Sequence, residues 1–194
     1  METTTFVSIF LAALLTDNFV LSRFLGICPF LGVSKKLDTA LGMSIAVTFV
    51  MVIATILTWP IQTFILTPND LGYLQTLVFV LIIATFVQFV SIILQKFFVG
   101  IYNSLGIFLP LMTTNCAILG VVILNIGDNF TFLQSIINSL GAGLGFLLAM
   151  ILFAGIRGRL ETSPIPKSLQ GLPITLIAAA FIAIVFLGFS GLAN

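Results

Sequence analysis

The chain carries one apolar motif twice, as Cys28-Pro-Phe-Leu-Gly-Val33 and as Cys116-Ala-Ile-Leu-Gly-Val121. Each copy is a cysteine, then any residue, an apolar residue and Leu-Gly-Val, and the two copies lie in opposite halves of the chain. No cysteine occurs outside these copies, since the whole sequence contains 2. A duplicated cysteine within apolar sequence suggests a metal or redox centre on a pseudo-two-fold axis.

The composition around the motif is that of a membrane protein. Of the 194 residues, 60% are hydrophobic and 7% are charged, whereas soluble domains have about 25% charged residues. Because about 20 apolar residues cross a bilayer as a helix, we predict an all-α polytopic protein with six spans. We expect the spans at about 4–33, 39–66, 72–95, 98–125, 131–155 and 172–192, within one integral membrane domain over residues 1–194. The net charge of +1 gives no reason to expect a nucleic-acid partner.

The charges of the predicted loops alternate along the chain. Basic residues follow the first, third and fifth spans, whereas the loops after the second and fourth spans contain acids and no base. The positive-inside rule therefore predicts cytoplasmic basic loops and places both chain ends on the outer face. The basic residues are Lys35, Lys36, Lys96, Arg157, Arg159 and Lys167, and the acidic ones are Asp70 and Asp128.

The first and fourth predicted spans are longer than one crossing needs, since about 20 residues suffice. Each contains helix-breaking residues near its cysteine, which favours two half-helices that meet inside the membrane. A tilted or kinked continuous helix is the alternative. The breaking residues are Pro29 with Gly26 and Gly32 in the first span, and Pro110 with Gly106 and Gly120 in the fourth.

The two halves of the chain read as an inverted repeat, residues 1–96 and 97–194 by our division. Both halves begin with a long cysteine-bearing span, and Leu41-Gly42 continuing to Met51 matches Leu140-Gly141 continuing to Met150. Three spans per repeat is an odd number, so the second copy inserts upside down relative to the first. The two cysteines are then expected to approach each other near the membrane midplane.

The residues alone leave three readings of Cys28 and Cys116. They are inert buried thiols, a disulfide, or metal ligands that select an Fe–S cluster, Zn or Cu(I). The chain has no Cys-x-x-Cys pair and no histidine, which disfavours dithiol exchange and excludes histidine ligation. A [2Fe–2S] cluster needs four thiolates, so a partner with two more cysteines would have to complete that site.

Two long stretches, Asn18 to Gly42 and Leu105 to Gly120, resemble the family of the A subunit of the bacterial Rnf complex, and so does the ending Gly188-Phe-Ser-Gly-Leu192. The resemblance covers essentially the whole chain. The homologous subunit of the sodium-pumping NADH:quinone oxidoreductase is similar too. Cys-Pro-Phe followed by Leu-Gly-Val looks more like the Rnf version.

The resemblance implies a membrane electron-transfer subunit of an ion-translocating ferredoxin:NAD⁺ oxidoreductase in the bacterial inner membrane. It also implies that Cys28 and Cys116 are the iron ligands of an intramembrane [2Fe–2S] cluster shared with the paralogous Rnf E protein, alongside the C, D, G and B proteins of the complex. As one part of a redox-driven translocase, the chain would hold no complete active site. No motif for NAD or flavin is visible in the sequence.

The sequence also allows two other functions, and three polar residues have no assigned role. The rival function is a small inverted-repeat ion transporter or channel with non-ligating cysteines, and a purely structural assembly subunit is a third possibility. Many relatives carry an acid three residues after the position of Gln88, where this chain has Ser91, so a cation site in the third span is doubtful. Asp17 and Arg23 have two interpretations. They are functional charges inside the membrane, or they neutralise each other or contact a partner subunit.

Three further features are the polar residues before Cys116, the small residues of the fifth span and the aromatic residues near the outer loop. Thr113, Thr114 and Asn115 are expected to satisfy backbone groups freed by the break or to donate hydrogen bonds to sulfur. The run Gly141-Ala-Gly-Leu-Gly145 predicts close packing against another helix. Trp59 and Tyr73 are expected to anchor the chain at the membrane interface.

Overall fold

A computed structural model of the protein describes residues 2–16, 18–33, 37–68, 72–97, 113–161, 163–164, 166 and 168–190. These residues form helices and turns with no strand among them, which confirms the all-α prediction. The elements are α1 (Glu2–Leu11), π-helix η1 (Ala12–Thr16), α2 (Ile27–Val33), α3 (Leu37–Ile61), π-helix η2 (Gln62–Leu66), 3-10 helix η3 (Gly72–Leu74), α4 (Gln75–Phe97), α7 (Cys116–Gly127), α8 (Phe132–Glu161) and α9 (Leu172–Ser190).

Within the part of the chain that the structure describes, three helices are long and apolar enough to cross a membrane, at Leu37–Leu66, Gly72–Ile93 and Phe132–Leu160. They confirm the predicted segments 39–66, 72–95 and 131–155, although α8 continues to Glu161 and so contains Arg157 and Arg159. Shorter apolar helices lie at Phe6–Leu15 and Leu172–Gly188, inside the first and sixth predicted spans, and at Cys116–Gly127, which extends two residues beyond the fourth. The count of six crossings and the inverted repeat stay predictions.

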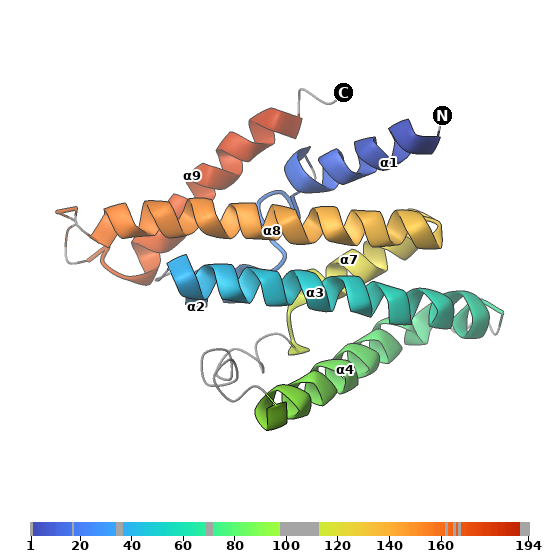
Figure 1. Ribbon diagram of the computed structural model, residues 1–194. Coiled ribbons are helices and arrows are strands. Elements are labelled where there is room, and N and C mark those ends of the chain that lie inside the picture. The colour runs from blue at the N-terminus through green and yellow to red at the C-terminus, as the bar shows by residue number, and fades with distance from the viewer. Residues whose placement is uncertain are drawn as a thin grey trace.

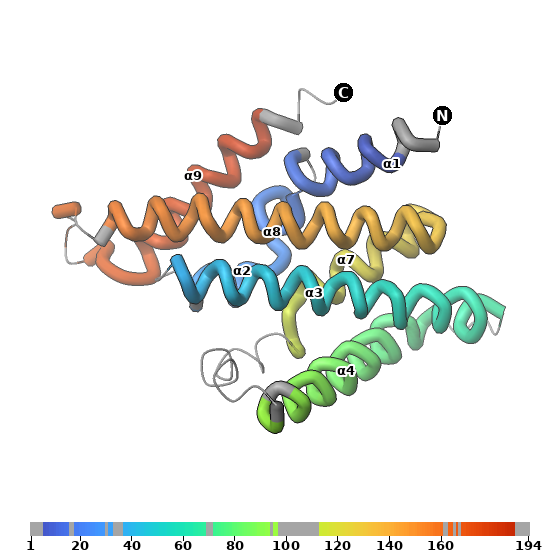
Figure 2. Tube along the Cα trace, viewed as in Figure 1, coloured from blue at the N-terminus to red at the C-terminus, as the bar shows by residue number. Residues whose placement is uncertain are grey.

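The helices pack around a central pair, α3 and α8, which lie side by side along most of their length (Figure 1). The helix α1 with η1 packs on α8, and α9 packs on η1 and α8. On the other side, α4 contacts α3 and α7 (Figure 2). The long helices α3 and α8 are therefore interior elements of the bundle, whereas α4 and α9 are exposed along much of their surface.

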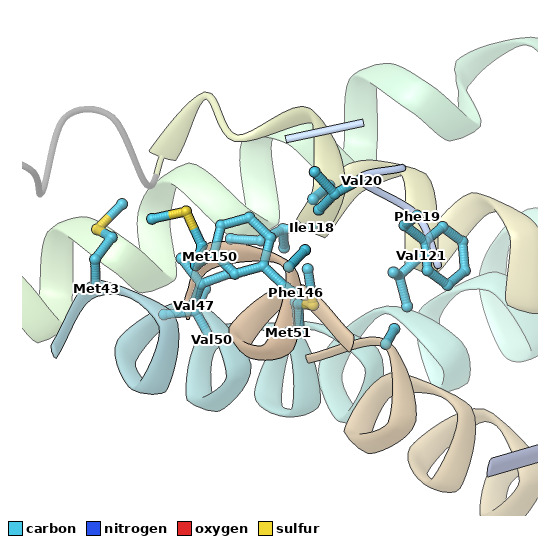
Figure 3. Packing of buried hydrophobic residues seen from close by; sticks show 14 of the residues in the cluster. Phe19, Val20, Met43, Val47, Val50, Met51, Ile118, Val121, Phe146 and Met150 are labelled. Carbon is cyan, nitrogen blue, oxygen red and sulfur yellow. The ribbon is translucent and has the colours of Figure 1, made fainter. Parts of the chain in front are cut away.

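One continuous apolar core joins α3, α7 and α8 to the loop before α2. Phe146 and Met150 of α8 lie beside Val47 and Val50 of α3, and Phe19 lies beside Val121 of α7 (Figure 3). These side chains are fully or almost fully buried. Lipid tails are as apolar as these side chains, so dense van der Waals packing, rather than exclusion from water, holds such a core together in a bilayer.

The glycines of α8 allow its neighbours to approach closely, as the sequence predicted. A Cβ on Gly143 would lie 2.5 Å from Thr48 Cγ2 of α3. On the opposite side, a Cβ on Gly141 would lie 2.9 Å from the carbonyl oxygen of Phe10 and one on Gly145 would lie 3.1 Å from that of Ala13. The helix α8 thus packs tightly on both sides, because Gly presents no side chain there.

The first predicted span is interrupted, but not at Pro29 as expected. Helical structure ends at Thr16 and resumes at Ile27, so Pro29 lies in the first turn of α2. A proline there loses nothing, because its missing N–H would have no intrahelical acceptor. The backbone reverses earlier, where Phe24 has φ of 56° and Gly26 has φ of 85°. Of the expected breakers Gly26 alone shapes the interruption, and Gly32 is an ordinary residue of α2.

The second predicted break is described only on one side. Pro110 and Gly106 lie outside the described residues, and α7 begins at Cys116. Gly120 is not a breaker, since it lies within α7. A Cβ at Gly120 would meet Leu25 Cδ1 at 2.5 Å, so this glycine instead admits the loop that precedes α2.

Candidate metal centre

Both cysteines lie in the first turn of a short helix, Cys28 as the second residue of α2 and Cys116 as the first residue of α7. The start of α7 is fixed by Asn115, whose backbone is extended and whose side-chain oxygen accepts a hydrogen bond from the Ala117 N–H at 3.0 Å. Asn is among the best residues at this capping position. The cap sets where the helix begins and hence where the Cys116 side chain projects.

The structure brings the loop before the first cysteine against the second cysteine. The Gly26 N–H donates a hydrogen bond to Cys116 Sγ, with 3.0 Å between nitrogen and sulfur. Next to it, a Cβ on Gly26 would lie 3.0 Å from the Ala117 Cβ. The two copies of the repeated motif are therefore joined through Gly26, two residues before Cys28.

The two thiols are free and reachable. Neither cysteine forms a disulfide; Cys28 is exposed and Cys116 is partly exposed. Among the described residues, no third His, Cys, Asp or Glu joins them in a group that could hold a metal ion. The segment that leads into Cys28 thus reaches Cys116 through Gly26. Two thiolates are half of the four that a [2Fe–2S] cluster needs.

Asn18 holds the interruption in place from within the bundle. Its side chain is almost completely buried, and Nδ2 donates to the Gly145 carbonyl oxygen of α8 at 2.9 Å. Its Oδ1 accepts from the Val20 N–H at 3.1 Å, and its own carbonyl oxygen accepts from the Ser22 N–H at 2.8 Å. One side chain thus ties the loop both to itself and to α8.

Replacing Asn18 with leucine is expected to destabilise the subunit by about 2–4 kcal/mol, because each buried group left without a hydrogen-bond partner costs about 1–3 kcal/mol. The measurement is the unfolding temperature of this subunit in the detergent-purified complex, which is expected to fall. Gln88→Leu on the exposed face of α4 makes the same chemical change at an exposed site and is the matched control. Equal unfolding temperatures for the two variants would contradict the role given to Asn18.

The far end of α2 is anchored to α8. The Arg157 guanidinium donates from Nη1 to the Leu31 carbonyl oxygen at 2.7 Å. A carbonyl in the last turn of a helix has no intrahelical partner and lies at the negative end of the helix dipole, so a cation is favourable there. The cysteine-bearing helix α2 is therefore held at its start by the Gly26 loop and at its end by Arg157.

Two other polar residues singled out from the sequence, Arg23 and Ser91, lie outside the two helices that carry the cysteines. Arg23 is exposed and lines a cavity of about 100 Å³ with Asp128 and Asn138, between η1, α7 and α8. Asp17 lies outside the described residues. Ser91 is half-buried on α4.

Comparison with known proteins places the chain in a family. Residues 6–193 match the model of a family described as "Rnf-Nqr subunit, membrane protein". The chain belongs to the Rnf-Nqr family.

Relatives in this Rnf-Nqr family are similar over nearly their full length. The A subunit of the Na(+)-translocating ferredoxin:NAD(+) oxidoreductase complex of Acetobacterium woodii is 56% identical over 188 residues, which are 97% of this chain and 98% of the relative. The A subunit of the ion-translocating oxidoreductase complex of Syntrophotalea carbinolica is 55% identical, covering 95% of each chain. That of Proteus mirabilis is 53% identical over 97% of this chain and 98% of the relative.

Sequence reasoning missed a buried polar network in this Rnf-Nqr protein. Asn138 Nδ2 donates to Asn125 Oδ1 at 2.6 Å, and Asn125 Nδ2 donates to Ser139 Oγ at 3.1 Å. Ser139 Oγ lies 2.6 Å from Thr55 Oγ1. The network links α7, α8 and α3. Asn125 and Asn138, which lie within predicted membrane spans, were the available signal, because polar side chains inside a membrane bundle tend to hydrogen-bond between helices.

Proposed function

We propose that the chain is a membrane electron-transfer subunit of an ion-translocating ferredoxin:NAD⁺ oxidoreductase. In this proposal Cys28 and Cys116 supply two of the four thiolate ligands of a [2Fe–2S] cluster, and the paralogous Rnf E protein supplies the other two. The observation that carries the assignment is the pair of free thiols on two helix starts that Gly26 joins. The family and the names of the relatives support the complex to which the chain is assigned.

The residues present fit such a cluster. Cys28 is exposed, so a partner protein has access to its sulfur. Beside Cys116, the buried Asn115 Nδ2 has no hydrogen-bond partner among the described residues, and a buried donor without an acceptor is costly. Cluster sulfurs accept hydrogen bonds from such donors. When bound, the cluster supplies the chemistry that this chain lacks, namely reversible one-electron transfer.

The protein's own residues then have distinct tasks. Cys28 and Cys116 hold the irons, Asn115 fixes the start of α7, and Asn18 and Arg157 fix the segments on either side of Cys28. Buried apolar side chains of α7 and α8 lie behind the site and limit water on that side. Low solvent access is one of the levers that set the potential of an Fe–S centre.

The remaining assignments follow from the same proposal. The chain lies in the bacterial inner membrane as six spans in two inverted repeats, each with a broken first helix, and both termini face outward. The B, C, D and G proteins are its further partners in the complex, and this chain binds no NAD or flavin of its own.

The test is the iron content and the electron paramagnetic resonance spectrum of the purified complex, with and without Cys28→Ser and Cys116→Ser. We expect each variant to lose the [2Fe–2S] signal while the complex still assembles. Ile27→Val, next to Cys28 in α2, is the control and should keep the signal. An unchanged cluster signal in both serine variants would overturn the assignment and favour a transporter or channel with non-ligating cysteines.

A further inference from the structure

The contact between Gly26 and Cys116 is more than a packing contact. The Gly26 N–H points at Cys116 Sγ at 3.0 Å, and the glycine itself is buried. The donor belongs to the loop that leads directly into Cys28. A backbone amide from the chain segment of one candidate ligand therefore lies against the sulfur of the other.

The geometry of this contact requires glycine. Gly26 has φ of 85°, a conformation that side-chain-bearing residues rarely adopt. A Cβ there would also lie 3.0 Å from the Ala117 Cβ and 3.1 Å from Phe146 Cε2. Just before it, the Leu25 N–H donates to the Phe19 carbonyl oxygen at 2.9 Å and fixes the preceding turn. The amide is thus held rigidly toward the sulfur.

We propose that Gly26 is a positioning residue that sets the reduction potential of the centre through this hydrogen bond. The inference rests on the proposed function, because it takes the Cys116 thiolate to be an iron ligand. An N–H aimed at the sulfur stabilises negative charge there. The reduced cluster carries one more negative charge than the oxidised cluster, so the hydrogen bond favours reduction and raises the potential.

The first test is a redox titration of the complex that carries Gly26→Ala, followed by the resonance signal of the reduced cluster. Moving the amide away is expected to lower the ratio of reduced to oxidised cluster about tenfold at a given potential, a downward shift of about 59 mV for a one-electron couple. Gly32→Ala is the matched control, since a Cβ at Gly32 has no neighbour within 4 Å among the described residues. A Gly26→Ala complex that retains its iron and titrates at the wild-type potential overturns the inference.

The second test detects the contact in the wild-type complex and uses the variants to assign it to a residue. Nitrogen-15 glycine is incorporated into the wild-type complex, and pulsed resonance measures nuclear couplings to the reduced cluster. We expect a coupling to one peptide nitrogen, retained in Gly32→Ala and lost in Gly26→Ala. A wild-type cluster without any glycine coupling overturns the inference and leaves the proposed function standing. If the Cys28→Ser and Cys116→Ser variants keep the [2Fe–2S] signal of the wild type, the proposed function itself is overturned.

Discussion

Cys116→Ser is expected to slow ferredoxin-dependent NAD⁺ reduction by the assembled complex more than about 100-fold, because changes merely around metal ligands already cost about 10–100-fold. Serine preserves the size of the side chain and removes the soft sulfur that iron prefers. The rate is measured in membrane vesicles and normalised to the amount of assembled complex. A rate near that of the wild type would contradict the role of Cys116 as an electron-carrying ligand.

Cys28→Ser should have the same effect, since both cysteines are assigned to one centre. The double variant is expected to be no slower than either single variant, because groups that act as a unit are not additive. If the fold-reductions of the two single variants multiply in the double variant, the two cysteines have separate functions. Ile27→Val controls for disturbance of α2.

Gly143→Leu is expected to destabilise the helix bundle strongly. Three atoms of Thr48 in α3 lie within 2.8 Å of the position that a Cβ on Gly143 would take. The helices α3 and α8 form the central pair of the bundle. Overpacking a dense core costs about 1–3 kcal/mol and occasionally more, and leucine adds three carbons beyond that Cβ. We expect little folded protein, measured as the monodisperse fraction after purification.

The control for this change lies in the same helix. Gly155 is exposed, and a Cβ there meets no atom of the described part of the chain within 4 Å. Gly155→Leu introduces the same side chain and should leave the monodisperse fraction unchanged. Gly143→Ala is expected to fall between the two. If Gly143→Leu behaves like Gly155→Leu, the close approach of α3 to α8 is wrong.

The long helices could be predicted from the sequence because their signal is local. Uninterrupted apolar runs define α3, α4 and α8 to within a few residues, apart from the end of α8. The charge pattern predicts Arg157 and Arg159 in a loop, whereas Arg157 donates to the Leu31 carbonyl oxygen and is part of the packed structure. Long cationic side chains can serve both as helix residues and as caps of a neighbour.

The interruption in the first span was predicted, but its position was not. The sequence favours Pro29 as the breaker, yet a proline in the first turn of a helix is harmless. The reversal depends on positive φ at Phe24 and Gly26. A phenylalanine at position 24 gives no sign of such a conformation. It is held by Asn18 and the tight fit to α7, which are long-range contacts.

The candidate site, too, was predictable from the sequence only in part. The repeated motif identified Cys28 and Cys116 as a pair, but it gave no hint that the Gly26 amide would bond to the second sulfur. Such a contact needs the loop, α7 and Phe146 of α8 in place together. The network of Asn125 and Asn138 was missed for the same reason, since hydrogen bonding between helices depends on which faces meet.

Thiol protection measured by mass spectrometry tests most directly whether Cys28 and Cys116 hold a cluster. The complex, purified without oxygen, is treated with an alkylating reagent before and after its iron is removed with a chelator under reducing conditions. Ligation predicts that both cysteines are protected before chelation and become alkylated together afterwards. Equal alkylation of both cysteines before and after iron removal would contradict their assignment as ligands.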